Sequence, residues 1–318
     1  MPRRVLAAAA VLAVAAIAVV VALPGDGGAH RLPKAAGCPI LPKSNHFNQR
    51  VDKLPRAGNS DTLVASIGLD EEFHADFGAG NYDGGPIGIP YTVVGKGQRK
   101  VPVAFDIAEE SDRGPYPIPR NAPIEGGASA DGDRHVLVVD RDRCRLYELF
   151  DARPQSGGAR WTAGSGAIFD LRSNRLRPAG WTSADAAGLP ILPGLARYPD
   201  VAKGSIDHAL RFTAQRTRRA YVYPARHYAS DDTDAALPPM GLRVRLKANV
   251  SLDGLGRQAR VIARALKRYG ALLADNGSPW FFSGTPDRRW DNDDLHTLDR
   301  LTGSDFEVVD TTSLAKPR

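Results

Sequence analysis

Glycine and proline recur along the whole chain, and they constrain its fold more than any other feature of the sequence. The 318 residues include 32 Gly and 24 Pro, and the extended apolar runs between them are short. Turn residues at this density end each strand or helix after a few residues. The pattern predicts a mainly β fold, an antiparallel β-sandwich or jelly roll, and argues against a Rossmann fold or a (β/α) barrel.

Three β-hairpins are predicted from turn chemistry. Residues 89–94 are expected to pair with 101–107, residues 135–140 with 144–150, and residues 271–274 with 280–282. Further strands are expected at residues 62–67, 160–162, 167–171, 209–213, 220–223 and 242–246. In the last of these, apolar residues alternate with Arg243 and Arg245, which indicates a sheet with one solvated face.

One amphipathic helix is predicted near the C-terminus, from Gly256 to Gly270. Its apolar residues recur at helical spacing and its basic residues take the other faces. Asp253 is placed to cap the start of this helix, and Gly270 is placed to end it.

The first 23 residues are a targeting segment. Arg3 and Arg4 precede an apolar run from Val5 to Leu23, which predicts a signal peptide over residues 1–29 or an uncleaved N-terminal membrane anchor. Cleavage after Ala22 or Ala29 would release the protein. Either alternative places the working domain outside the cytoplasm, secreted or attached to the membrane only through this segment. An irregular lead-in (30–60), a single β-rich domain (61–310) and a tail (311–318) are expected to follow.

Two cysteines, Cys38 and Cys144, occur in a chain that is expected to leave the cytoplasm. Extracytoplasmic compartments are oxidising, so the pair is predicted to form a disulfide. The formal net charge of +6 is too small to indicate a nucleic-acid partner, and a monomer is expected.

Several common catalytic motifs are missing. The sequence contains no Gly-x-Ser-x-Gly elbow, P-loop, dinucleotide fingerprint or His-Glu-x-x-His motif, and no cofactor or metal is predicted. Calcium is suggested only loosely, because no aspartate group matches an EF-hand loop. The groups in question are Asp131/Asp133, Asp231/Asp232/Asp234 and Asp291/Asp293/Asp294.

The densest collection of acid-base groups lies between residues 101 and 150. A glycosidase needs one protonated and one ionised carboxyl group, and this segment offers several candidates. Glu109 or Glu110 is the predicted general acid. The predicted ionised partner is Asp106 or Glu125, and His135 is a further candidate base.

Substrate-binding candidates come from later in the chain. An aromatic ring can pack on the apolar face of a sugar while its edge keeps polar contacts. Trp181 and Trp290 lie in loops beside aspartates and are expected to be exposed. The full set of substrate-binding candidates is Trp181, Asp185, Arg211, His227, Trp280 and Trp290.

Two resemblances bear on these expectations. The string Phe105-Asp-Ile-Ala-Glu109 resembles part of the Glu-x-Asp-x-x-Glu strand motif of laminarinase-like glycoside hydrolases, with Ala104 where that family has its nucleophilic glutamate. The segments GSGAIFDLRSNRLRPAGWTSADAAGLPILPGL and RYGALLADNGSPWFFSG resemble an uncharacterised family of exported, actinobacterial-type bacterial proteins. The second resemblance implies export but no activity.

Export, carboxylates and loop aromatics together predict a secreted protein that acts on an extracellular polysaccharide or cell-wall glycan, as a glycoside hydrolase with paired carboxylates. The alternative is a non-catalytic carbohydrate-binding or cell-envelope protein. A polysaccharide lyase that uses His135 or His227 with a tyrosine base is a third reading.

Overall fold

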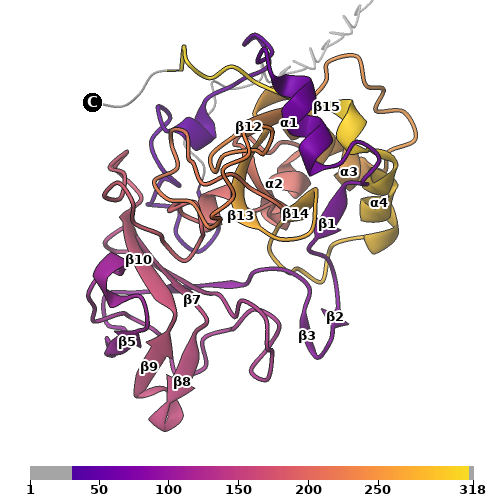
Figure 1. The fold of residues 1–318 in the computed structure, drawn as a ribbon. Coiled ribbons are helices and arrows are strands. Elements are labelled where there is room, and N and C mark those ends of the chain that lie inside the picture. Colours follow the sequence, from indigo (N-terminus) through magenta and orange to yellow (C-terminus); the bar gives the residue numbers. More distant parts are fainter. Residues whose placement is uncertain (1–30, 315–318) are drawn as a thin grey trace, which may run out of the picture.

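The computed structural model describes residues 31–314 (Figure 1), so the predicted leader lies outside the described residues. The largest sheet has six strands in the order β1 (His74–Asp76), β14 (Phe281–Ser283), β11 (Leu210–Ala214), β13 (Ala271–Asn276), β12 (Arg243–Leu246) and β15 (Phe306–Val308). A four-stranded sheet has the order β10 (Ser165–Asp170), β7 (Arg145–Phe150), β6 (Val136–Asp140) and β4 (Tyr91–Val94). The mainly β expectation is confirmed.

The remaining strands of the described residues form two small sheets. One contains β5 (Val103–Phe105), β9 (Arg160–Ala163) and β8 (Arg153–Gln155), and the other is the hairpin of β2 (Asn81–Tyr82) and β3 (Gly85–Pro86). The α-helices of the described residues are α1 (Ser60–Ile67), α2 (Tyr198–Lys203), α3 (Arg257–Arg268) and α4 (Asn292–His296).

The sheets are mixed, so the expectation of purely antiparallel pairing is wrong. Parallel pairs join β1 to β14, β11 to β13, β4 to β6 and β5 to β9. Parallel neighbours need long crossover connections, and the long irregular segments of this chain supply them. Short-range turn chemistry cannot reveal such pairings.

The β6–β7 hairpin is confirmed and forms the centre of the four-stranded sheet. All five residues of β6 are buried, because both faces of the sheet are covered. Leu137 and Val139 belong to the main core, while Val136 and Val138 belong to a second core shared with β9. One face of this sheet therefore packs on the main core, to which the six-stranded sheet also belongs, and the other face packs on the small β5–β9–β8 sheet.

Two other predicted hairpins are wrong. β4 pairs with β6, and β5 pairs with β9, so residues 89–94 and 101–107 are not partners. β11 lies between β13 and β14 in the sheet, so these strands are also not neighbours. Residues 220–223 form only an isolated bridge between Tyr221 and Met240 instead of a strand.

Helix α3 is confirmed, whereas the expectation of a single helix is wrong. Residues 62–67 form most of α1 and not a strand, because Leu63, Val64 and Ile67 are buried along one helical face. The first backbone N–H groups of α3, at Gln258 and Ala259, donate to the carboxylate of Asp294 at 3.0 and 2.8 Å. The cap thus comes from α4 and not from Asp253.

Strand β12 has no solvated face at Arg243. This arginine is 1% exposed, and it donates hydrogen bonds to the carbonyl oxygens of Tyr269, His46 and Gln49 at 2.7 to 3.2 Å. The lead-in segment covers the face that the alternation predicted to be wet. Buried guanidinium groups need such partners, and backbone carbonyls supply them here.

The predicted disulfide between Cys38 and Cys144 is confirmed. It joins residues 106 apart in the sequence, a loop for which the chain-entropy treatment gives about 4 to 5 kcal/mol of stabilisation. Residues 31–314 contain no helix that is both long and apolar enough to cross a membrane.

Candidate functional site

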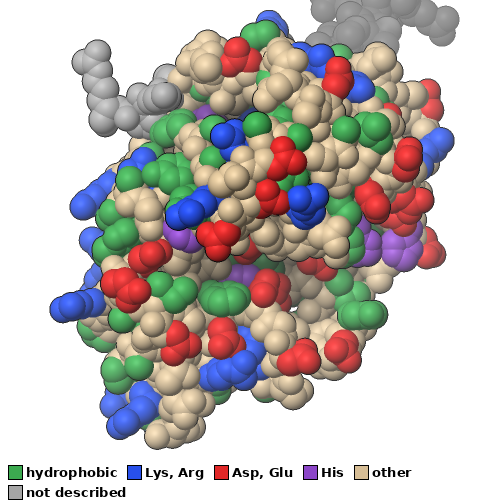
Figure 2. Space-filling model, in the orientation of Figure 1, with side chains coloured by type: hydrophobic (Ala, Val, Ile, Leu, Met, Phe, Trp, Pro, Cys, Tyr) green, Lys and Arg blue, Asp and Glu red, His purple; other side chains and the backbone are tan. Residues whose placement is uncertain are grey.

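A cleft of about 340 Å³ opens between the end of β13 and the 3-10 turn at Ala108–Glu110. Figure 2 shows this face hollowed between the part that carries β13 and β14 and the part that carries β7 and β10. Its ionisable side chains come from five separate segments of the chain. The carboxylates are Glu110, Asp133, Asp185 and Asp275, and the imidazole is that of His227.

Asp275 reaches the cleft because of a β-bulge. Phe212 of β11 pairs with Leu273, but the next residue, Thr213, pairs with Asp275, so Ala274 is the extra residue. A bulge of this kind turns the following side chain onto the opposite face of the strand. Asp275 therefore points to the same face of the sheet as Arg211. Without the bulge, the residue on that face would be Ala274.

The environment of Asp275 favours its protonated form. Burial raises the pKa of its carboxyl group to about 7, and the neighbouring carboxylate of Asp185 acts in the same direction. The nearest guanidinium nitrogen, Nη2 of Arg211, is 4.0 Å from Oδ2. Since the side chain remains 21% exposed, it can exchange protons with whatever enters the cleft.

Beneath the cleft, Arg211 and Asp185 form a bidentate ion pair. Nη2 donates to Oδ1 at 2.8 Å and Nε to Oδ2 at 3.2 Å, while Nη1 donates to Oγ of Ser283 at 2.6 Å. The side chains are 5% and 1% exposed. The sequence singled out both residues as substrate ligands, and the structure pairs them with each other.

A second ion pair joins Glu125 to the buried His135, with side chains that are 22% and 2% exposed. Nδ1 of His135 lies 2.6 Å from Oε2 of Glu125, and Nε2 lies 3.0 Å from the carbonyl oxygen of Ala184. Both partners accept, so both ring nitrogens donate and the ring is an imidazolium. Burial lowers the pKa of His135, but Glu125 outweighs it and raises the value to about 9. His135 therefore has no free lone pair with which to act as a base. We call these two ion pairs the floor pairs.

Glu110 and His227 lie close to each other in the wall of the cleft. Oε2 of Glu110 accepts from the backbone N–H of Thr182 at 2.8 Å and lies 3.9 Å from Nε2 of His227. Nδ1 of His227 donates to the carbonyl oxygen of Ala186 at 2.9 Å. Nε2 is therefore the ring nitrogen left facing Glu110. The side chains are 26% and 24% exposed, so both are open to a ligand.

Two predicted carboxylates lie outside this arrangement. Asp106 and Glu109 are exposed and do not line the cleft, although Glu109 is adjacent to Glu110 in the turn. A 3-10 turn spaces successive side chains by about 120°, so two neighbouring glutamates cannot both face inward. Of the four acids predicted between residues 101 and 150, the structure brings Glu110 to the cleft and Glu125 to its floor.

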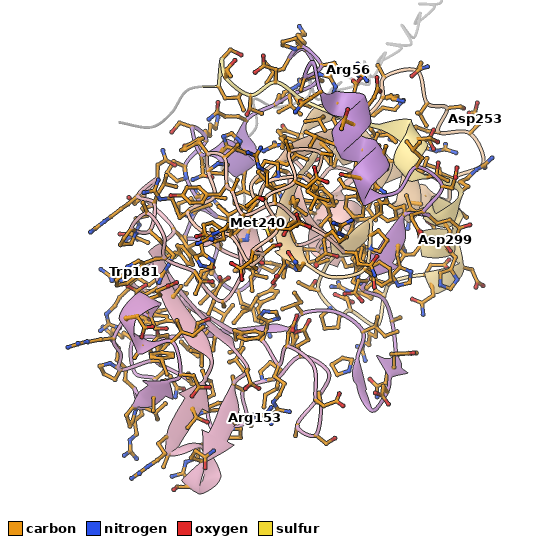
Figure 3. The ribbon with its side chains drawn as sticks, in the orientation of Figure 1. Arg56, Arg153, Trp181, Met240, Asp253 and Asp299 are labelled. Carbon is orange, nitrogen blue, oxygen red and sulfur yellow. A yellow bond between two sulfur atoms is a disulfide. The ribbon has the colours of Figure 1, made fainter. Side chains whose placement is uncertain are left out.

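The tryptophans do not line the cleft. Trp280 is fully buried and stacks on Phe212 and Phe306, and Trp290 is 4% exposed, so its expected exposure is wrong. Trp181 is half-buried with the guanidinium of Arg177 over its ring at 5.5 Å, and Figure 3 shows it at the edge of the molecule beside β10.

Sequence reasoning missed Asp275 and Glu148. The run Asp275-Asn-Gly277 has the composition of a turn, and nothing in the sequence indicates the bulge that turns Asp275 inward. Glu148 stands in the apolar run of β7, which was a usable signal of a buried polar group. Burial raises the pKa of Glu148 to about 7, and its carboxylate accepts from the backbone N–H groups of Ile191 and Leu192.

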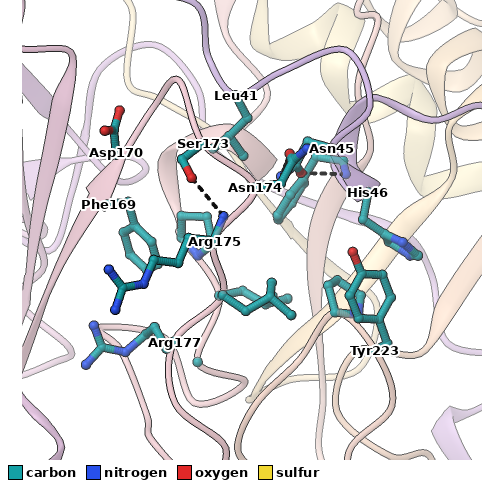
Figure 4. Close-up of a pocket in the computed structure, with 16 residues that line it drawn as sticks. Leu41, Asn45, His46, Phe169, Asp170, Ser173, Asn174, Arg175, Arg177 and Tyr223 are labelled. Atoms are coloured by element: carbon teal, nitrogen blue, oxygen red, sulfur yellow. Dashed lines mark hydrogen bonds between the residues drawn. The ribbon is translucent and has the colours of Figure 1, made fainter. Parts of the chain in front are cut away.

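A smaller cavity near His46 is not a comparable site (Figure 4). Its volume is about 30 Å³, roughly that of a single water molecule. His46 is 1% exposed, and burial lowers its pKa to about 3. His46 is therefore a core residue with a neutral imidazole, which packs edge-on against Tyr223.

Among residues 31–314, no group of three or more histidine, cysteine, aspartate or glutamate side chains is arranged to hold a metal ion. No protein-family model, curated protein or solved structure matches the chain.

Proposed function

We propose that the protein hydrolyses glycosidic bonds in an extracellular polysaccharide or cell-wall glycan. The observation that carries the proposal is the meeting of Asp275 and Glu110, from distant segments and unlike environments, in one open cleft. Glycosidic hydrolysis needs this combination of a protonated acid and an ionised carboxylate.

Asp275 is assigned as the general acid. Its carboxyl group is protonated up to about pH 7 and can donate that proton to the leaving glycosidic oxygen as the bond to the anomeric carbon breaks. Arg211 would hold the resulting carboxylate, because its guanidinium is already 4.0 Å away.

Glu110 is assigned as the ionised partner. The N–H of Thr182 stabilises its charged form, and His227 lies on its other side. Glu110 either attacks the anomeric carbon itself or takes a proton from the water that does so. Nε2 of His227 would then accept a hydrogen bond from a sugar hydroxyl group, since Nδ1 already donates to the carbonyl oxygen of Ala186.

The location proposed for this activity is outside the cytoplasm. The predicted leader and the Cys38–Cys144 disulfide both support it, since structural disulfides persist in oxidising compartments. We further propose that the six-stranded and four-stranded sheets be regarded as a sandwich whose open edge forms the cleft.

The test is reducing-sugar release from a panel of bacterial, plant and fungal glycans by residues 31–318. Asp275→Asn and Glu110→Gln should each lower the rate by at least about a hundredfold, the usual scale for losing an acid or base. Glu109→Gln is the matched control, because it removes a neighbouring exposed carboxylate and should leave the rate unchanged. A wild-type protein that binds a glycan without cutting it would replace this proposal with the non-catalytic binding reading.

A further inference from the structure

A second pocket of about 430 Å³ lies beside the edge strand β1, under the hairpin of β2 and β3. We call it the hairpin pocket; its lining includes His74, Asp76, Tyr82 and Phe281. Figure 1 shows the hairpin projecting below β1, and Figure 2 shows histidine side chains gathered near β1 and α4 on the same face as the cleft.

The hairpin pocket is aromatic on two sides. The rings of His74 and Phe281 stack on each other with their centroids 4.0 Å apart, and both line the pocket on the side of the sheet. Tyr82 stands on the hairpin with 80% of its surface exposed. A tyrosine ring left so open gains nothing from the fold, whereas a ligand that covered it would bury a large apolar face.

The backbone of the hairpin is anchored on both sides of Tyr82. The side chain of Asn292 in α4 accepts from the backbone N–H of Ala79 and donates to its carbonyl oxygen, both at 2.9 Å. On the other side, Gly85 packs so closely on Gly126 that a Cβ there would lie 2.0 Å from the Gly126 backbone. Gly126 follows Glu125, so the hairpin rests on the segment that carries one of the floor pairs.

One row of side chains connects the hairpin pocket to the cleft. Asp76 pairs with Ser283 across β1 and β14, and Oγ of Ser283 accepts from Arg211, which lies 4.0 Å from Asp275. Three strand spacings separate β1 from β13, a distance of about 14 Å. A chain of several sugar rings can span that distance.

We propose that the hairpin pocket is a second sugar-binding subsite, in which Tyr82 and the His74–Phe281 stack hold a pyranose ring of the glycan chain that is cut in the cleft. The subsite deepens the proposed function and rests on it. Asp76 offers a hydrogen-bonding group at the edge of the ring, which suits hydroxyl groups better than a wholly apolar ligand.

The charges indicate an uncharged pyranose and not a uronic acid. Burial raises the pKa of Asp76, which lines the pocket, and the carboxylates of Glu125 and Asp133 act in the same direction against the opposing charges of His74 and Arg211. The surroundings of Asp76 therefore disfavour a further negative charge, and a carboxylate on the ligand would be disfavoured there in the same way. A neutral or amino-sugar polymer is the substrate class that fits.

The experiment measures the affinity of gluco-, xylo- and chito-oligosaccharides, from disaccharide to hexasaccharide, by calorimetry. Binding is measured in the Asp275→Asn background so that the chains stay intact, and reducing-sugar release is followed separately with Asp275 present. Tyr82→Ala should weaken hexasaccharide binding about tenfold and leave disaccharide binding unchanged. Tyr82→Trp should restore the affinity. Leu69→Ala, at a side chain that is 46% exposed and outside the pocket, is the control.

The outcomes separate the two proposals. Binding that depends on Tyr82 without any hydrolysis would keep the subsite and overturn the hydrolase. Hydrolysis and hexasaccharide binding that are both indifferent to Tyr82 and to His74→Ala would overturn the subsite alone. Tighter binding of oligogalacturonates than of neutral chains would overturn the substrate class, and a protein that neither binds nor cuts any glycan would overturn both proposals.

Discussion

Beneath the cleft, Arg211 and Asp185 hold each other at 2.8 Å with side chains that are 5% and 1% exposed. In the cleft wall, Asp275 is 21% exposed and its nearest cation is 4.0 Å away. The first carboxylate is committed to a partner, and the second is left with a pKa near 7. In this molecule, charged groups with complete ion pairs hold the cleft in shape, whereas a carboxyl group without a close partner is free to exchange a proton with a ligand.

The largest effect should follow from breaking a floor pair. Arg211→Met leaves Asp185 buried without its partner and should lower the free energy of unfolding by about 3 to 5 kcal/mol. This loss of unfolding free energy is measured by urea denaturation. Arg216→Ala, at an exposed ion pair with Asp232, should cost less than about 1 kcal/mol. Equal losses of unfolding free energy for the two variants would mean that the buried Arg211–Asp185 pair stabilises the protein no more than an exposed ion pair does.

The second floor pair should show itself in the pH dependence of stability. The pKa of His135 is about 9 in the folded state against 6.5 unfolded, so its contribution is complete below about pH 6.5 and is lost as the pH rises through 9. Glu125→Gln should lower the free energy of unfolding by about 2 kcal/mol at pH 6 and by less at pH 9. A loss of the same size at both pH values would show that the ring is neutral.

Asp275→Asn should change the free energy of unfolding in the opposite direction from Glu125→Gln. The folded pKa of Asp275 is about 7 and the unfolded value 3.8, so the native state binds the extra proton and loses stability as the pH rises between these values. The variant should therefore be more stable than the wild type by about 1 kcal/mol at pH 8, discounted for its partial exposure, and equal to it at pH 4. Denaturation at the two pH values tests the sign, and destabilisation at pH 8 would make Asp275 a structural residue.

The smallest effect is expected at Asp106. Its side chain is exposed and outside the cleft, so Asp106→Asn should change the free energy of unfolding by less than about 0.5 kcal/mol and leave glycan cleavage intact. Any loss of activity would return the site to the acidic strand end that the sequence suggested.

Local signals in the sequence predicted local structure. The β6–β7 hairpin, helix α3 and the disulfide follow from turn residues, apolar periodicity and cysteine count. Residues 62–67 show the limit of this reasoning, because a short apolar run fits both a helix and a strand. The insertion of β11 between β13 and β14 depends on the whole sheet, and no short segment encodes it.

The site was predictable to the same degree. Glu110, Glu125, His135, Asp185, Arg211 and His227 were all singled out, but their pairing into floor and wall was not. Residue type tells which groups can ionise, while burial and neighbours decide which of them stay free. Asp275 was missed because its position depends on one extra residue in β13, and an apolar strand that ends in Asp-Asn-Gly gives no sign of a bulge.

The most direct test of the difference between floor and wall is the carboxyl pKa of Asp275, measured by carbon-detected NMR with Asp275→Asn to assign the resonance. We expect a titration midpoint near 7, which leaves the group protonated and able to act as an acid. A midpoint near 4, the value of an ordinary aspartate, would contradict the assignment and leave the cleft without its general acid.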